Sequence, residues 1–142
     1  AKNFGASHVF KNDGEIALDK AIRSLVGIEG VDVAVDTTGN PRCIEQAYEL
    51  THADGKTVLV GVPKKGENIS IYSLPLHFQK TLTGSHGGDA EPHLDIPRYI
   101  RLYENGRMSL EGLITHEFSL EQINEAICMV QGGYAGRCII KM

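Results

Sequence analysis

Three apolar runs of the sequence each end in a short segment of small polar residues and glycines. The segments are Asp36-Thr37-Thr38-Gly39, Val60-Gly61-Val62-Pro63 and Thr83-Gly84-Ser85-His86-Gly87-Gly88. Glycine has no Cβ, so a ligand or another backbone can approach it closely. A single segment of this kind is usually only a tight turn. Three of them at the ends of strands favour a crevice for a flat ligand, of the kind found at the carboxyl edge of open α/β sheets.

Potential metal ligands gather in one loop of the sequence. The loop holds His86, Asp89, Glu91, His93 and Asp95 within ten residues, and imidazole and carboxylate groups both bind metals. The spacing matches no closed zinc pattern, and a solvated acidic loop that leads into a helix explains it equally well. We therefore predict no metal ligand here. His86, where the chain leaves the sheet, fits a polar lining group better than a general base.

Arg137 follows a glycine-rich turn, residues 132–136, and opens the last apolar run. Its guanidinium fork could bind a phosphate, or it could be an ordinary surface arginine, and the residues alone leave both interpretations open. No motif places a nucleophile beside a base, since the chain lacks Gly-x-Ser-x-Gly, His-Glu-x-x-His and a phosphate-loop Gly-Lys-Ser/Thr. We predict no catalytic residue in the chain.

The fingerprint of dinucleotide-binding sheets, Gly-x-Gly-x-x-Gly, is absent as well. None of the sixteen glycines is followed by another glycine two residues later. The chain also begins with Ala1 rather than methionine, in a segment that reads as the middle of an element. These features indicate a fragment, although removal of an initiator methionine is the alternative explanation of the first residue.

Composition limits the class of protein. The 142 residues are 42% hydrophobic and 23% charged, which is typical of one globular domain. The net charge of −4 argues against nucleic acid or an anionic membrane as a partner. No apolar run approaches the ~20 residues of a membrane span, and no secretory signal pattern is present. The three cysteines, Cys43, Cys128 and Cys138, fit free thiols in a reducing, cytoplasmic compartment.

Helices and strands alternate through the first 62 residues. Residues 1–6 read as the end of a helix closed by Gly5, residues 7–10 as a short strand, and residues 14–27 as a helix. Residues 31–36 form a buried strand, Asn40 caps a helix with Pro41 in its first turn, and residues 57–62 form the next strand. Such alternation predicts an α/β fold with a parallel, doubly wound sheet and right-handed crossovers.

The second half continues with shorter elements. We predict an edge strand or ribbon over residues 68–72, a short helix over 74–79 and a strand over 80–85. A helix over 95–105 and a strand over 113–118 follow. A capping box at Ser119 opens a helix that Gly132 and Gly133 end, and residues 137–140 form the last strand. The order of the strands in the sheet does not follow from these patterns.

Five segments, in this order and spacing, resemble the carboxyl-terminal part of the zinc-containing alcohol dehydrogenases of the medium-chain dehydrogenase/reductase family. The segments are VDVAVDTTGN, DGKTVLVGVP, LTGSHGGD, ITHEFSLEQINEAI and GRCIIKM. The resemblance implies a Rossmann-like sheet that lacks its first strand and Gly-rich turn. Residues 1–142 would be a partial NAD(P)-binding domain, with 107–142 as its C-terminal return segment. In this family the phosphate loop and the zinc ligands lie upstream, so truncation would explain the missing fingerprint.

The resemblance also implies cofactor contacts for eleven residues. Thr37, Thr38, Gly39 and Asn40 would lie along the adenosine side of NAD. Val60, Gly61 and Val62 would lie beneath the nicotinamide, and Gly84, Ser85 and His86 near the nicotinamide and its ribose. Arg137 would contact the pyrophosphate. NAD is the expected cofactor with NADP left open, and zinc is expected only in the parent enzyme. Homodimers of the family imply a dimer surface at residues 69–85.

These implications predict a fragment of an NAD(P)-dependent, zinc-type alcohol or polyol dehydrogenase. The parent enzyme would act on a small-molecule alcohol or aldehyde, and the fragment would be inactive by itself. Two alternatives stay open. One is a stand-alone, non-catalytic nucleotide-binding or assembly module, and the other is a fragment of a zinc-free quinone or enoyl reductase.

Overall fold

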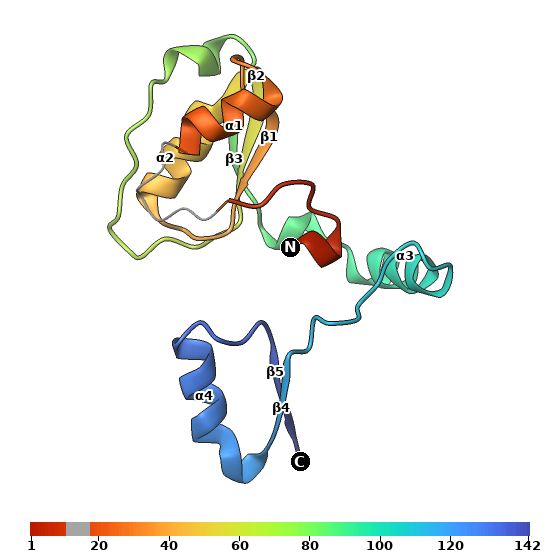
Figure 1. Ribbon diagram of the computed structural model, residues 1–142. Coiled ribbons are helices and arrows are strands. Elements are labelled where there is room, and N and C mark those ends of the chain that lie inside the picture. Colours follow the sequence, from red (N-terminus) through yellow and green to blue (C-terminus); the bar gives the residue numbers. More distant parts are fainter. Residues whose placement is uncertain (11–17) are drawn as a thin grey trace. The chain divides into compact units, whose positions relative to one another are not determined.

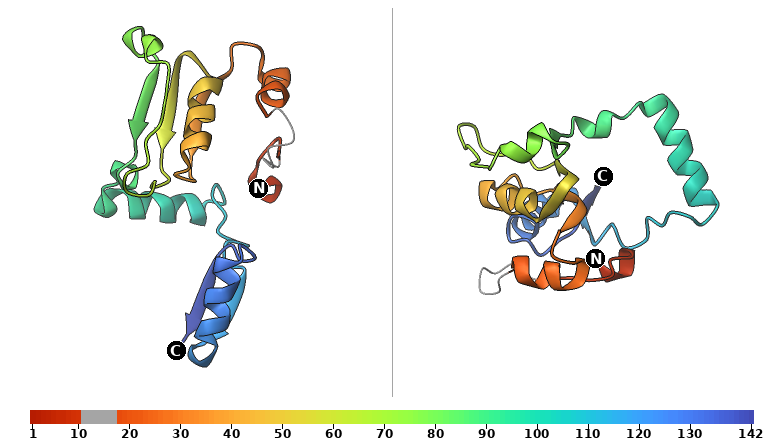
Figure 2. Two further views of the ribbon diagram at one scale, coloured as in Figure 1. Left: turned by 90° about the vertical axis from the view of Figure 1, so that its left-hand side faces the viewer. Right: turned by 90° about the horizontal axis from the view of Figure 1, so that it is seen from above.

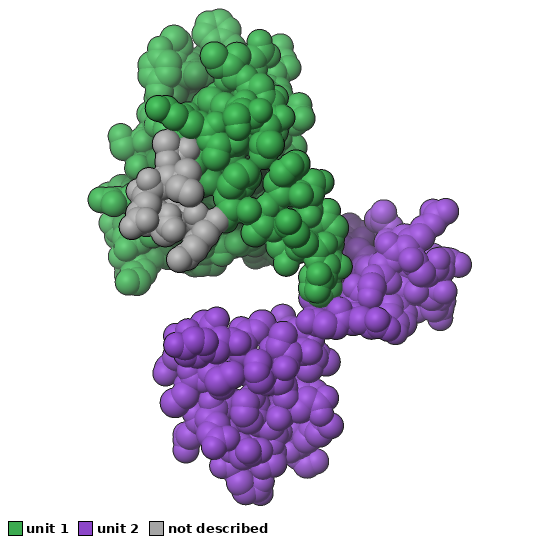
Figure 3. All heavy atoms as spheres, viewed as in Figure 1, with its two compact units in different colours: residues 1–89 green, residues 90–142 purple. Residues whose placement is uncertain are grey.

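The chain divides into two compact units, each with its own sheet. The computed structural model describes residues 1–10 and 18–142, and the units are Ala1–Asp89 and Ala90–Met142 (Figure 3). The first unit contains a sheet of three strands and the second a sheet of two. The assignment of residues 107–142 as a C-terminal return stays a prediction.

The sheet of the first unit is parallel, as the alternation of elements predicted. Its strands are β1 (Val31–Asp36), β2 (Thr51–Leu59) and β3 (Thr81–Gly84), and their order is β1-β2-β3 (Figure 1). In the register, Ala34 of β1 and Leu82 of β3 flank Thr57 of β2, which is fully buried. The order makes β2 the central strand, so all three carboxyl ends lie at one edge of the sheet.

Helix α2 (Pro41–Leu50) covers one face of this sheet (Figures 1 and 2). It begins as predicted, because the side-chain oxygen of Asn40 accepts a hydrogen bond of 2.9 Å from the backbone N–H of Arg42, and Pro41 occupies the first turn. Ile44 and Tyr48 are each only 2% exposed. Burial of such a side chain contributes roughly 1.5–3 kcal/mol, so these two residues help to hold the helix in the first unit.

Strand β2 ends earlier than the sequence predicted. The apolar run continues to Val62, but the backbone N–H groups of Val60 and Gly61 both donate to the carbonyl oxygen of Asp36, at 2.8 and 3.0 Å. These bonds turn the chain across the end of β1, so the strand ends at Leu59. The predicted end at residue 62 is therefore wrong, and a tertiary contact is the reason.

Strand β2 also begins earlier, at Thr51, through an irregularity in its pairing with β1. Val31 pairs with Thr51, whereas Val33 pairs with Lys56, so the register shifts between these pairs. The hydroxyl oxygens of Thr51 and Thr57 lie 2.8 Å apart, which shows that the residues between them bulge out of the strand. Gly55 fits there because an added Cβ would lie 2.8 Å from the carbonyl oxygen of Asp32.

The first residues differ in part from the prediction. A short 3₁₀ helix, η1 (Lys2–Phe4), is closed by Gly5 with φ of 93°, as predicted. Residues 7–10 are exposed and form no strand, because no described strand pairs with them. Helix α1 (Leu18–Val26) matches the predicted helix over 14–27, whose first four residues lie outside the described part of the chain.

Residues 68–72 form no strand either, because side chains of α2 take the place of a neighbouring strand. The backbone N–H of Ser70 donates to Oε1 of Glu45 at 2.7 Å, and the hydroxyl of Tyr48 donates to the carbonyl oxygen of Tyr72 at 2.9 Å. The segment is thus held along the helix by its own backbone groups. Two short 3₁₀ helices flank β3 in the sequence. They are η2 (Leu74–His77) before the strand and η3 (Gly87–Asp89) after it.

The second unit contains α3 (Pro92–Glu104), β4 (His116–Ser119), η4 (Leu120–Gln122), α4 (Ile123–Gln131) and β5 (Cys138–Lys141). Strands β4 and β5 are parallel, with His116 opposite Cys138, and α4 is the connection between them. The predicted capping box is present, since the backbone N–H of Ser119 donates to Oε1 of Gln122 at 3.2 Å. Ala126 of α4 is only 4% exposed.

Candidate functional site

Asp36 organises the turn at the carboxyl end of β1. Its side chain is 4% exposed, and both of its carboxylate oxygens accept hydrogen bonds. Oδ1 accepts from the hydroxyl of Thr38 at 2.6 Å and from the backbone N–H of Thr38 at 3.2 Å, while Oδ2 accepts from the backbone N–H of Gly39 at 2.8 Å. Hydrogen bonds to the Asp36 carboxylate therefore hold the turn together from within.

The pKa of Asp36 is lowered by this arrangement. Burial of the carboxyl raises its pKa, but the bonds from the Thr38 hydroxyl and from the backbone N–H groups of Gly39 and Thr38 outweigh that effect. The carboxylate is thus ionised at neutral pH, and its lone pairs accept the hydrogen bonds of the turn. Sequence reasoning did not name Asp36 as a site residue. The signal was an aspartate at the end of a strand with Gly39 three residues later, which is typical of an Asx-type turn.

The turn after β2 packs directly on the turn after β1. A Cβ added at Gly61 would lie 2.1 Å from the backbone nitrogen of Gly39 and 2.5 Å from that of Thr38. A Cβ added at Gly39, whose φ is +67°, would lie 2.5 Å from the carbonyl group of Val62. Both glycines are therefore required, because two backbones meet at this place without room for a side chain.

The segment after β3 joins the same edge of the sheet. Gly84 pairs with Leu59, and the backbone N–H of Ser85 donates to the carbonyl oxygen of Leu59 at 2.9 Å. The hydroxyl of Ser85 accepts from the backbone N–H of Gly88 at 3.1 Å, and His86 is exposed. The three glycine-containing segments thus lie at one edge. Together with Asn40, which directly follows the first segment, they carry ten of the eleven predicted cofactor residues.

The polar side chains of the first turn are mostly engaged by the turn itself. The hydroxyl of Thr38 donates to Asp36 and accepts from the backbone N–H of Asn40 at 3.0 Å, and Oδ1 of Asn40 caps α2. Val60 and Val62 differ, since 47% and 88% of their surfaces are exposed. The edge therefore offers an apolar surface beside a rigid backbone, which is what a planar ligand requires.

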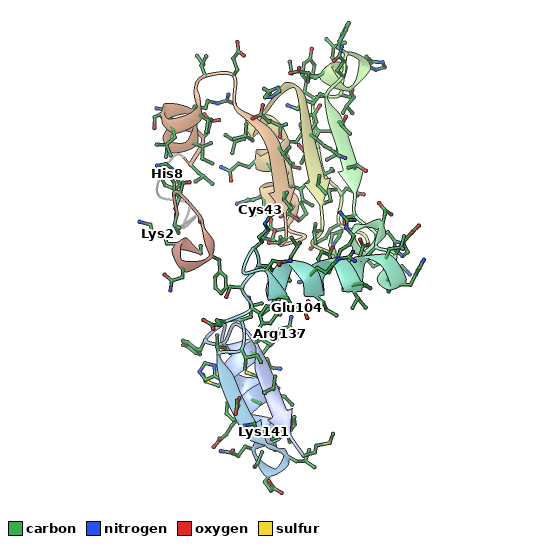
Figure 4. The ribbon with its side chains drawn as sticks, turned by 90° about the vertical axis from the view of Figure 1, so that its right-hand side faces the viewer. Lys2, His8, Cys43, Glu104, Arg137 and Lys141 are labelled. Atoms are coloured by element: carbon green, nitrogen blue, oxygen red, sulfur yellow. The ribbon has the colours of Figure 1, made fainter. Side chains whose placement is uncertain are left out.

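Arg137, the eleventh predicted residue, lies in the second unit, immediately before β5 (Figure 4). Its side chain is exposed, and Thr115 holds its backbone. The hydroxyl oxygen of Thr115 accepts from the N–H groups of Gly136 at 3.0 Å and Arg137 at 3.2 Å, and the backbone N–H of Thr115 donates to the carbonyl oxygen of Arg137 at 2.9 Å. The guanidinium is therefore presented from a fixed backbone position.

Over residues 1–10 and 18–142, no group of three or more His, Cys, Asp or Glu side chains is arranged to hold a metal ion. The loop with His86 and His93 is included in that range. In the same part of the chain, no helix is both long and apolar enough to cross a membrane.

A parallel sheet with helices between its strands and glycine turns at its carboxyl edge defines a Rossmann-like α/β fold. The family model described as zinc-binding dehydrogenase matches residues 1–121 of the chain. The chain belongs to this family of zinc-binding dehydrogenases, which confirms the resemblance found in the sequence. The described residues contain no set of ligands for the zinc ion that the family name implies.

Relatives cover the whole chain, and the chain covers a smaller part of each relative. Alcohol dehydrogenase 1 of Trifolium repens is 34% identical over 144 residues, which are 100% of this chain and 38% of the relative. Alcohol dehydrogenase 1 of Pisum sativum is 35% identical over 146 residues, with the same coverage. The chain thus spans about 38% of the length of these curated relatives, in their carboxyl-terminal part.

A solved structure is similar as well. The crystal structure of benzyl alcohol dehydrogenase from Acinetobacter calcoaceticus superimposes with a TM-score of 0.88 and 29% sequence identity. The similarity covers 99% of this chain and 38% of that one. Fold and sequence therefore agree on the family.

Proposed function

We propose that this chain forms part of the cofactor-binding edge of an NAD(P)-dependent, zinc-type alcohol dehydrogenase. The parent enzyme transfers a hydride between the carbon of a small alcohol or aldehyde and the nicotinamide ring. Zinc, held by residues other than those described, supplies the polarisation of the substrate oxygen. The observation that carries the proposal is the backbone contact of the turns at Gly39 and Gly61, with the β3 segment beside them.

Each segment has a role in this proposal. Residues 37–40 lie along the adenosine side of the cofactor, and their rigidity comes from the Asp36 carboxylate. The exposed side chains of Val60 and Val62 form an apolar floor beneath the nicotinamide. Residues 84–86 lie beside the nicotinamide ribose. Arg137 presents its guanidinium to the pyrophosphate, since a charge-assisted fork suits that group.

By itself the chain binds the cofactor at most and does not catalyse hydride transfer. This proposal rests on coverage, since the chain spans only about 38% of the length of its alcohol dehydrogenase relatives. We further propose that the protein works in the cytoplasm, where its three free cysteines stay reduced.

We also propose a homodimer formed through residues 69–85. In the first unit β3 is an edge strand, and edge strands readily pair with another chain. Large apolar side chains are exposed along the same segment, among them Tyr72 at 69%, Leu74 at 50% and Phe78 at 69%. Sedimentation velocity on the chain and on its Phe78→Ser variant tests this. A dimer that dissociates in the variant supports the surface, and an unchanged dimer contradicts it.

An NADH titration of the folded chain, followed by nicotinamide fluorescence, tests the cofactor proposal. Binding that weakens by roughly 10- to 100-fold in Arg137→Ala is expected, since a hydrogen bond to a charged group contributes about 1.5–3 kcal/mol. Lys65→Ala removes the same charge from an exposed turn and should leave affinity nearly unchanged. Affinity that both substitutions weaken equally contradicts the proposed edge, whereas a folded chain that does not bind NADH supports the interpretation of the chain as a fragment. NADPH in place of NADH decides between the two cofactors.

A further inference from the structure

Positive charge gathers on one side of α3 in the second unit. A cavity of about 650 Å³ there is lined by Arg98, Arg101, Leu102, Asn105 and Arg107. Three of its five lining residues are arginines, although the whole chain carries 14 basic and 18 acidic side chains and a net charge of −4. The local charge is thus opposite in sign to that of the protein.

Helix periodicity separates these arginines from the apolar stripe of α3. Ile96, Tyr99, Ile100 and Tyr103 follow the i, i+3, i+4, i+7 spacing of one helix face. With 100° per residue, Arg98, Arg101 and Asn105 lie on the opposite side of the helix. Packing of the apolar stripe against any neighbour therefore leaves the arginine side in solvent.

The end of the helix brings Arg107 back to the same place. The side-chain amide of Asn105 donates to the carbonyl oxygen of Arg101 at 2.8 Å. Gly106, with φ of +67°, then reverses the chain, and the backbone N–H of Arg107 donates to the carbonyl oxygen of Leu102 at 2.9 Å. Arg107 is thereby positioned beside the last turn of α3, although it lies outside the helix.

The positive charges of the cavity are only partly neutralised. Nη1 of Arg98 lies 3.2 Å from Oδ1 of Asp95. Arg101 and Arg107 form no ion pair with any described residue, and the carboxylate of Glu104 does not line the cavity (Figure 4 labels Glu104 at the end of α3). Arginines at the end of a helix do stabilise its dipole, but that effect does not require three guanidinium groups around one cavity.

We propose that Arg98, Arg101 and Arg107 form a binding site for a phosphate group. A guanidinium presents planar N–H forks that bind phosphate oxygens in pairs, and it keeps its charge at every physiological pH. Two unpaired forks and a third shared with Asp95 match the charge of a phosphate dianion. The group belongs either to free phosphate or to a phosphorylated metabolite. The site uses none of the proposed cofactor residues, and the proposal does not depend on them.

Titration of the chain with inorganic phosphate, followed by NMR of the arginine side chains, tests the proposal. The Nε–Hε resonance of each arginine reports on its own site, so binding here is distinguished from binding at Arg137. The resonances of Arg101 and Arg107 should shift together and saturate. A parallel titration with AMP distinguishes the sources, since a phosphorylated metabolite gives tighter binding than free phosphate when groups beyond the phosphate are recognised.

Matched variants separate a site from a general charge effect. Arg101→Gln with Arg107→Gln should weaken phosphate binding by at least tenfold. Lys64→Gln with Lys65→Gln removes the same two charges from an exposed turn of the first unit and should change affinity less than twofold. Arg101→Lys keeps the charge without the fork, and intermediate affinity is expected. Equal weakening in both double variants, or resonances of Arg101 and Arg107 that do not shift, would overturn the proposal.

Discussion

Nε2 of His52 lies 2.9 Å from Oδ1 of Asp32, and this contact joins the start of β2 to the start of β1. On the other side of the ring, Nδ1 lies 2.6 Å from Oδ1 of Asp54. Both ring nitrogens can donate only when the imidazole is protonated, so the arrangement favours the cation. It lies at the amino ends of the strands, at the edge opposite the candidate site.

The paired carboxylates predict a pH-dependent stability. The hydrogen bond with Asp32 is the main cause of a raised His52 pKa; burial opposes it, and the charges of Asp54 and Asp32 raise the pKa further. The folded-state pKa of His52 is higher than the unfolded value of about 6.5. The stabilisation that the protonated ring provides is therefore fully present at a pH below the unfolded value. It is lost as the pH rises through the folded-state pKa.

Urea unfolding of the chain and of His52→Gln between pH 5.5 and 8.5 measures this effect. The difference in the unfolding free energies of the two proteins should be largest at the acidic end and should shrink as the pH rises. Asp32→Asn serves as a second variant and should flatten the dependence. A difference that stays constant across the range would contradict the prediction.

The close approach of the two turns predicts a steric penalty at Gly61. Gly61→Ala places a Cβ 2.1 Å from the backbone nitrogen of Gly39, and the backbone must move to relieve the contact. We expect a loss of at least about 2 kcal/mol of unfolding free energy, in the range of overpacked cores. At Gly84 an added Cβ meets nothing within 4 Å, so Gly84→Ala should change stability far less. Equal losses of unfolding free energy in both variants would show that the close contact with Gly39 is not the reason why position 61 requires glycine.

The sequence predicted those elements whose ends are determined locally. The limits of β1 agree with the prediction at both ends, because the apolar run, which only Asp32 interrupts, stops at Asp36 and a turn follows. The start of α2 was predicted for the same reason, since Asn40 and Pro41 lie next to each other in the chain. Local chemistry is sufficient when both partners of the hydrogen bond lie within a few residues.

Elements that depend on distant partners were less predictable. Residues 57–62 look like one strand, but the carbonyl oxygen of Asp36 accepts a hydrogen bond from the backbone N–H of Val60, and the strand ends there. Residues 68–72 alternate like a strand, yet their backbone groups bind Glu45 and Tyr48 instead. Alternation indicates an extended chain and carries no information on whether a second strand lies beside it.

The candidate site was predicted as a set of positions rather than as an arrangement. Glycines after three strands indicated the edge, and the structure brings those three segments together. The contact between Gly39 and Gly61 depends on strand order, which the sequence patterns did not determine. The internal roles of Asp36 and Thr38 likewise appear only when the turn is seen folded.

The Asp36 carboxylate should contribute to stability as an ionised acceptor. Asp36→Asn replaces one carboxylate oxygen with an NH₂ group, which cannot accept a hydrogen bond. If the NH₂ group takes the place of Oδ2, the backbone N–H of Gly39 loses its acceptor, and if it takes the place of Oδ1, Thr38 loses its acceptor. In either case a buried donor is left without a partner. A loss of roughly 1–3 kcal/mol at pH 7 is expected. Glu29→Gln, at an exposed turn, removes the same charge and should have little effect.

The pH dependence of the Asp36 contribution has the opposite sign to that of His52. The Asp36 pKa is lowered in the folded state, so its contribution is present above the ordinary value of about 3.9. It is lost as the pH falls through the folded-state pKa. Thermal unfolding of the chain and of Asp36→Asn between pH 2.5 and 7 measures this effect. The difference between the unfolding free energies of the two proteins should become smaller at the acidic end, and a difference that became larger there would contradict this account.

Thr115 should control the order of the segment that presents Arg137. Its hydroxyl accepts from the N–H groups of Gly136 and Arg137 and donates to the carbonyl oxygen of Arg137 at 3.2 Å. Thr115→Val keeps the shape and removes these bonds, each of which contributes about 1 kcal/mol. We expect hydrogen exchange at the amides of Gly136 and Arg137 to become about fivefold faster or more.

Thr115→Ser is the matched control, because it keeps the hydroxyl and loses only a methyl group. Its exchange rates at Gly136 and Arg137 should stay close to those of the unchanged chain. If Thr115→Val weakens NADH binding together with faster exchange, while Thr115→Ser changes neither, Thr115 positions the arginine. If exchange in the Val variant is unchanged, the backbone pairing of β4 with β5, which includes His116 opposite Cys138, is sufficient to hold the segment without the hydroxyl.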